Sequence, residues 1–103
     1  MTCEVQKLDG VIRIRGDMTI YNAALVKDAL FAALQGVTDV RIDLSGVSEV
    51  DTTGLQVLLM AHRVCASGGV PFAIADLSDA MREVLGLLRL DTLAQPVRLE
   101  VAQ

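Results

Sequence analysis

A short segment near the middle of the chain places carboxylate and hydroxyl side chains at the start of a helix-like stretch. The segment comprises Asp51, Thr52, Thr53 and Gly54, which follow a polar loop and open an apolar run. Backbone N–H groups at a helix N-terminus lack partners within the helix and carry partial positive charge. Such an end stabilises an oxyanion, including a phosphate carried on Thr52 or Thr53. Gly54 has no Cβ and so allows another stretch of backbone to approach closely.

The same segment also has a purely structural interpretation. Asp and Thr are common helix caps because their side-chain oxygens accept hydrogen bonds from the first free N–H groups. Asp51 or Thr52 would then do no more than start the helix. The spacing of these residues is compatible with either role.

The helix that follows carries a stripe of polar residues with one apolar member. At helical spacing Gln56, Met60 and Arg63 share one side, near Thr52 and opposite the apolar side. Met60 is either a single exposed apolar residue, which is common, or part of a docking face for a partner protein. A flexible Met side chain suits such a face because it adapts to the surface that it meets.

Other kinds of site chemistry find little support in the sequence. His62 is the chain's one histidine, so a catalytic triad has a single base to draw on, and no metal-ligand spacing surrounds it. We expect His62 to be structural. No glycine-rich phosphate loop precedes a Lys-Ser/Thr pair. The sequence therefore predicts a binding module rather than an enzyme, with no metal and no cofactor.

The elements that must position these residues alternate between strand and helix periodicity. An Asp9-Gly10 pair predicts a two-residue hairpin between the first two strands. This alternation is typical of an α/β fold, here a mixed sheet of about five strands with helices packed on it. The predicted strands span 3–8, 11–15, 40–44, 70–75 and 97–101, and the predicted helices span 21–34, 53–66 and 78–88, the last with Ser78 as its N-cap.

Length and composition limit the classes of protein to consider. The 103 residues, 52% of them hydrophobic, allow a single domain, which we expect to span residues 1–103. The net charge is −4, the 9 Lys and Arg residues are scattered, and aromatic residues make up 3%, which argues against a nucleic-acid partner. No apolar run approaches the roughly 20 residues that span a bilayer, so no direct membrane insertion is expected. Two cysteines without a CxxC pair favour reduced thiols in the cytoplasm.

Several motifs together resemble one known family, the STAS domain of bacterial anti-sigma factor antagonists. The main one places Asp-Thr-Thr-Gly-Leu between an Ile-Asp-Leu-Ser strand and an apolar helix. The resemblance covers roughly residues 11–93, and its motifs lie at 14–18, 42–59, 68–72 and 81–88.

The resemblance implies a protein that switches between partners. In this family a histidine-kinase-like serine/threonine kinase phosphorylates the residue after the motif Asp, which here is Thr52, with Thr53 as the alternative. The unphosphorylated form binds the kinase or an anti-sigma factor, and a PP2C-type phosphatase resets the cycle. The implied docking surface comprises the 51–54 segment with Gln56, Met60 and Arg63. Two positions differ from the family pattern, since the acceptor is Thr rather than the commoner Ser and Thr19 stands where relatives carry Asp.

A second function is compatible with the same motifs. Relatives with Thr after the motif Asp also occur as subunits of ABC-type transport complexes, including phospholipid transporters. In that case the 51–54 segment would hold an ATPase subunit without any phosphate chemistry.

Overall fold

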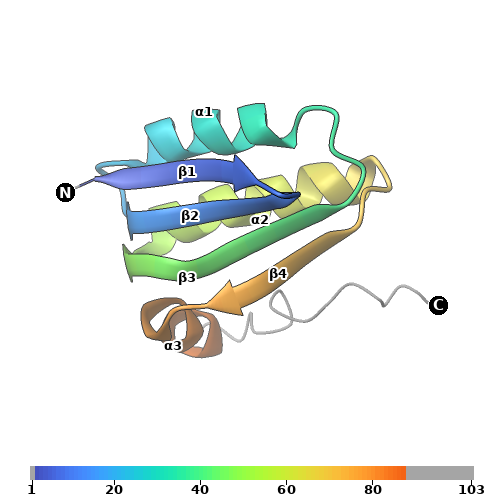
Figure 1. Cartoon of the computed structure of the whole chain (residues 1–103). Helices are drawn as coiled ribbons and strands as arrows, with labels where there is room; N and C mark the ends of the chain where they lie inside the picture. The colour runs from blue at the N-terminus through green and yellow to red at the C-terminus, as the bar shows by residue number, and fades with distance from the viewer. Residues whose placement is uncertain (1, 88–103) are drawn as a thin grey trace.

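The computed structural model describes residues 2–87 and contains one mixed sheet and three helices (Figure 1). The strand order is β1-β2-β3-β4, with β1 antiparallel to β2 and the other three strands parallel. The α/β architecture predicted from the sequence is thus confirmed. In chain order the elements are β1 (Cys3–Leu8), β2 (Val11–Met18), α1 (Ala23–Leu34), β3 (Val40–Val50), α2 (Thr52–Ser67), β4 (Phe72–Leu77) and α3 (Asp79–Leu87).

The predicted hairpin joins β1 to β2. Asp9 and Gly10 have φ angles of 53° and 79°, the left-handed values that a two-residue hairpin turn requires. Gly adopts this conformation without steric cost, and Asp is among the few other residues that tolerate it. The turn sets the register in which Leu8 lies opposite Val11.

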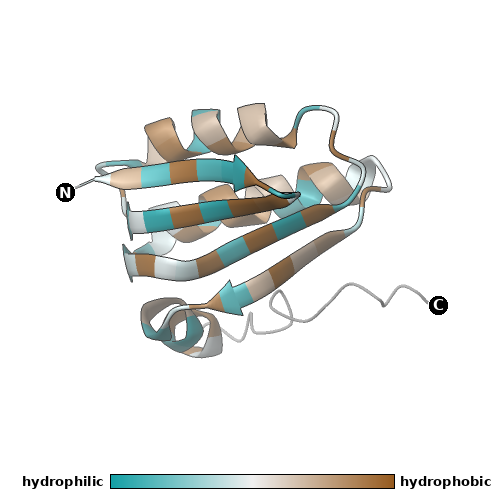
Figure 2. Cartoon of the chain, in the orientation of Figure 1, coloured by the Kyte–Doolittle hydropathy of each residue, from teal (hydrophilic) through white to brown (hydrophobic). Residues whose placement is uncertain are grey.

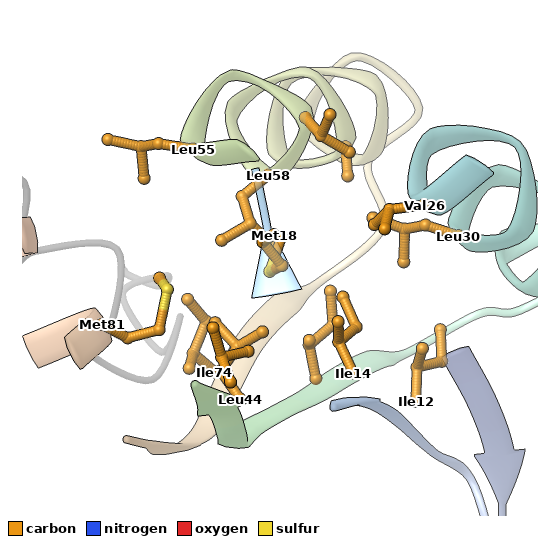
Figure 3. Close-up of a cluster of buried hydrophobic side chains, with 14 of the residues drawn as sticks. Ile12, Ile14, Met18, Val26, Leu30, Leu44, Leu55, Leu58, Ile74 and Met81 are labelled. Carbon is orange, nitrogen blue, oxygen red and sulfur yellow. The ribbon is translucent and has the colours of Figure 1, made fainter. Parts of the chain in front are cut away.

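The core lies between the sheet and its three helices (Figure 3). Ile14, Leu44 and Ile74 point from the strands toward side chains of the helices. Along the strands, hydrophobic residues alternate with hydrophilic ones (Figure 2), because successive side chains point to opposite faces of a sheet. The apolar set is therefore buried under the helices on one face, and the polar set lies on the other.

Two strands are longer than the sequence pattern predicts. The second strand does not stop before Gly16 but continues to Met18, and the third does not end at Leu44 but runs to Val50. The prediction that a polar loop follows the strand at Leu44 is therefore wrong. The residues Ser45 and Gly46 are typical of turns, yet the parallel pairing with β2 continues past them. The register between β2 and β3 shifts twice along the way, once between Arg13 and Arg15 and once between Gly16 and Asp17. Pairing with a distant strand satisfies the backbone here, and this cannot be read from local residue types.

The remaining boundaries differ by a few residues from those predicted. The α1 helix begins at Ala23 rather than Tyr21, and β4 is shifted toward the C-terminus by two residues at each end. Ser78 caps α3 as predicted, because its hydroxyl accepts a hydrogen bond from the Met81 N–H at 3.1 Å. The described part of the chain has four strands rather than about five, and the segment predicted as a strand at 97–101 lies outside the described residues.

None of the helices within residues 2–87 is long and apolar enough to cross a membrane.

Candidate functional site

The candidate site lies where β3 passes directly into α2. Asp51 is the residue between them and is the N-cap of α2. One carboxylate oxygen, Oδ1, accepts a hydrogen bond from the Gly54 N–H at 2.9 Å, and the other, Oδ2, accepts one from the Ile20 N–H at 2.9 Å. These two bonds, the Gly54 bond first, lower the pKa of Asp51 below its ordinary value. Of the two possible caps, Asp51 rather than Thr52 performs the role.

Gly54 allows the start of α2 to lie against the end of β2. A Cβ built on this glycine would collide with the backbone carbonyl of Met18. The same carbonyl accepts a hydrogen bond from the Asp51 N–H at 3.2 Å. The expected close backbone approach at Gly54 is therefore present, and it fixes the first turn of α2 on the sheet.

Thr52 is the first residue of α2 and is exposed, whereas Thr53 is half-buried. Since α2 begins at Thr52, this hydroxyl lies at the positive end of the helix dipole. The Asp51 carboxylate, directly before Thr52, already accepts the hydrogen bond from the Gly54 N–H in the first helical turn. A phosphate on Thr52 would thus meet a favourable helix end and an unfavourable neighbouring carboxylate.

A shallow hollow of about 260 Å³ adjoins Thr52 and is mostly apolar. Its walls are the junction between β3 and α2 together with Val84 and Leu87 of α3, and Asp51 is the charged residue among those that line it. The sequence analysis did not associate α3 with the site. The packing of α3 beside the start of α2 is a tertiary contact, and nothing in the local pattern could have revealed it.

The loop between β2 and α1 also reaches the site. Ile20, held by Asp51, is 64% exposed, and its neighbour Tyr21 is 90% exposed. Neither residue was singled out from the sequence, because the contact joins residues 31 positions apart in the chain. Large exposed apolar side chains that adjoin one another are typical of a surface that binds another protein.

The predicted docking stripe on α2 surrounds a second hollow. Gln56, Met60 and Arg63 line a depression of about 380 Å³ together with Leu59. Met60 is 38% exposed, so part of its side chain is available for contact. Leu59 was missed, although its positions three after Gln56 and four before Arg63 place it beside them on a helix.

The histidine and the two cysteines, considered above as possible bases, ligands or redox groups, lie in packing environments. The His62 ring packs edge-on against the ring of Phe72, with centroids 5.1 Å apart. Cys3 and Cys65 are free thiols, and burial raises the pKa of Cys65. Within residues 2–87 no group of three or more His, Cys, Asp and Glu side chains could hold a metal ion.

Comparison with known proteins identifies relatives of the whole described fold. A family model described as "Mlab, STAS domain" matches residues 2–98. A structure from Thermotoga maritima, assigned as an anti-sigma factor antagonist, is 25% identical, with a TM-score of 0.73 over 90% of this chain and 83% of that one. An anti-sigma factor antagonist from Mycobacterium paratuberculosis is 24% identical, with a TM-score of 0.73 over 90% and 81%.

A third similar structure is that of a phosphorylated protein. The Bacillus cell fate determinant SpoIIAA, solved in its phosphorylated form, is 17% identical, with a TM-score of 0.65 over 91% of this chain and 89% of that one. At this identity the likeness concerns the fold alone. Since the family model covers nearly all of the 103 residues, the chain belongs to the STAS domain family.

Proposed function

We propose that this chain is a regulatory protein-binding module of the anti-sigma factor antagonist type, without enzymatic activity, acting in the cytoplasm. Its partner is an anti-sigma factor or a histidine-kinase-like serine/threonine kinase. Phosphorylation of Thr52 by such a kinase releases the partner, and a PP2C-type phosphatase restores binding. Family membership and the two antagonist structures of similar fold support the general role.

The observation that carries the proposal is the exposure of Thr52 at the junction of β3 and α2. Phosphorylation would add about −1.5 to −2 charges at pH 7 to a hydroxyl that a partner can reach. The hollow beside it is apolar, and Asp51 already contributes a negative charge. A phosphate buried there by a partner would be desolvated without a basic side chain from the described lining residues to offset it. The modification therefore acts against docking rather than on the fold.

The docking surface that we propose extends from this junction along α2. It comprises Asp51, Thr52 and Thr53 at the start of the helix, and Gln56, Met60 and Arg63 along its exposed side. Gly54, predicted to belong to this surface, is buried against Met18 and positions the first turn from beneath. A partner lying along α2 would cover both hollows at once. An interface of this kind has an apolar centre and a polar rim, as protein–protein contacts commonly do.

The experiment compares three variants in pull-downs with the purified kinase or anti-sigma factor. Thr52→Ala is expected to bind as the wild type does, and Thr52→Glu to lose most binding. Thr38→Glu is the matched control, because Thr38 is an exposed threonine in the connection between α1 and β3, at the other end of the sheet. Equal binding by Thr52→Glu and Thr38→Glu would refute the switch. Phosphosite mapping after incubation with cell lysate and ATP decides between Thr52 and Thr53.

One feature of the site favours a second candidate, a constitutive subunit that holds the ATPase of an ABC-type transport complex. The Asp51 carboxylate already accepts the hydrogen bond from the Gly54 N–H, a donor that would otherwise stabilise a phosphate at this helix end. A permanent apolar contact around Thr52 needs no such donor. Co-purification with an ATPase subunit, combined with the absence of phosphate on Thr52 in mass spectra of the cellular protein, would favour this candidate.

A further inference from the structure

The face of the sheet opposite the helices carries charged side chains at the centre of the sheet. Parallel strands are usually covered on both faces. Here the three helices pack on one face of β2, β3 and β4, and no helix within residues 2–87 covers the other (Figures 1 and 3). Arg13 and Arg15 are exposed on that open face and alternate along β2 with the buried Ile12 and Ile14. Their side chains are thus available to a ligand.

These two arginines line a hollow of about 390 Å³ that also includes Asp43, Ser45 and Gly46 of β3. Pockets that bind small molecules commonly have volumes of about 300–1,000 Å³. The hollow is separate from the two at the α2 docking surface, since none of its lining residues is shared with them.

One side of the hollow is held in place by a small polar network. The Asp43 carboxylate accepts a hydrogen bond from the Ser45 N–H at 2.9 Å, and its other oxygen lies 3.5 Å from Nε of Arg13. The hydrogen bonds from Ser45, more than the charge of Arg13, lower the pKa of Asp43. Asp43 therefore stays ionised at neutral pH and orients Arg13 through Nε. The terminal N–H groups of that guanidinium are left for a ligand, because Arg has five donors in all.

Arg15 supplies the second cation. Its side chain lies directly over Gly46, where a Cβ would collide with the Arg15 Cγ. Glu4 is its register partner on β1, yet within the described residues no carboxylate lies within 4.0 Å of the Arg15 guanidinium. Two arginines and one aspartate give the hollow a net charge of +1, in a protein whose net charge is −4.

We propose that this hollow binds the oxyanion group, a phosphate or a carboxylate, of a small molecule. Arg15 is the main ligand, and Arg13 adds terminal N–H donors, while the Ser45 side chain is engaged with Asp43. Guanidinium groups match both anions because their N–H groups form paired, charge-assisted hydrogen bonds with two oxygens. The concave shape and modest volume favour a small molecule over a protein or a nucleic acid on this face.

The test is an NMR titration of the full chain, labelled with ¹⁵N, at constant ionic strength. Inorganic phosphate is the probe in one arm and citrate in the other, so that the two anion chemistries are distinguished. We expect saturable shifts of the Ser45 and Gly46 amide signals with at least one probe. Arg15→Gln should weaken this binding about tenfold or more, which corresponds to about 1.4 kcal/mol.

Arg41→Gln is the matched control, because Arg41 is an exposed arginine of β3 that lies outside the hollow and pairs with Asp39 at 3.7 Å. It removes the same charge and should leave the titration unchanged. Shifts that rise without saturation for both anions would overturn the proposal. So would an equal loss of binding in Arg41→Gln, since the effect would then reflect general charge. Binding to vesicles of anionic phospholipid that depends on Arg15, without binding of either small anion, would assign the face to a membrane surface instead.

Discussion

The Asp51 carboxylate holds together two parts of the chain that are distant in sequence. One oxygen caps α2 through the Gly54 N–H, and the other binds the Ile20 N–H of the loop that follows β2. This single side chain therefore sets the position of Thr52 and of the exposed Ile20 at the same time. At the residue scale the candidate site depends on a carboxylate that holds the fold at this junction and also lines the hollow beside Thr52.

Removing the Asp51 carboxylate should destabilise the protein measurably. Asp51→Ala loses the helix cap and the Ile20 bond, and we expect the free energy of unfolding to fall by about 1–2 kcal/mol. Asp51→Asn keeps one oxygen to cap the helix but places an NH₂ donor opposite the Ile20 N–H. The free energy of unfolding should therefore fall by about 1 kcal/mol. Urea denaturation measures both. Asp28→Ala, an exposed position on α1, is the control and should change stability by less than ~0.5 kcal/mol. Equal stabilities of Asp51→Ala and the wild type would contradict this role.

The same carboxylate predicts how stability depends on pH. Folding lowers the pKa of Asp51 below its value in the unfolded chain, where the pKa of an Asp is about 3.9. The folded protein thus binds fewer protons, so this contribution is complete above about pH 4 and is lost as the pH falls through the folded-state pKa. Denaturation midpoints measured at neutral and acidic pH should show a smaller acid loss for Asp51→Asn than for the wild type. An identical acid loss would show that Asp51 is not responsible.

At the scale of elements, the junction of β3 and α2 depends on contacts between β2 and the first turn of α2. The Met18 carbonyl accepts a hydrogen bond from the Asp51 backbone N–H and lies against the Cα of Gly54. The sequence predicted the role of Gly54 correctly, because a glycine inside a helix pattern indicates a close backbone approach. It did not predict the length of β3, because Ser45 and Gly46 resemble a turn unless the paired strand β2 is known.

Two glycines in helices should respond in opposite ways to the same substitution. Gly54→Ala places a methyl group against the Met18 carbonyl, and we expect it to cost at least about 2 kcal/mol through overpacking. Gly86→Ala in α3 meets no atom within 4 Å among the described residues, so it should be neutral or stabilise by up to about 1 kcal/mol. Thermal unfolding of both variants provides the comparison. A neutral Gly54→Ala would mean that α2 does not depend on this contact.

At the scale of the whole molecule, the order of the elements and the grouping of residues on α2 could be predicted from sequence, but the surroundings of that candidate site could not. Alternating periodicities predicted the α/β sheet, and helical spacing predicted that Gln56, Met60 and Arg63 lie together. The parts contributed by α3 and by the loop after β2, including Val84 and Ile20, depend on tertiary packing. Such contacts leave no local pattern because each partner residue is ordinary in its own element.

The central claim is that a phosphate on Thr52 changes docking and leaves the fold intact. The most direct measurement compares the unphosphorylated chain with the chain phosphorylated at Thr52, recording partner affinity and free energy of unfolding for each. We predict that affinity falls about tenfold or more, equivalent to about 1.4 kcal/mol, while the free energy of unfolding changes by less than that. Unchanged affinity, or a loss of affinity that accompanies unfolding of the chain, would contradict the account.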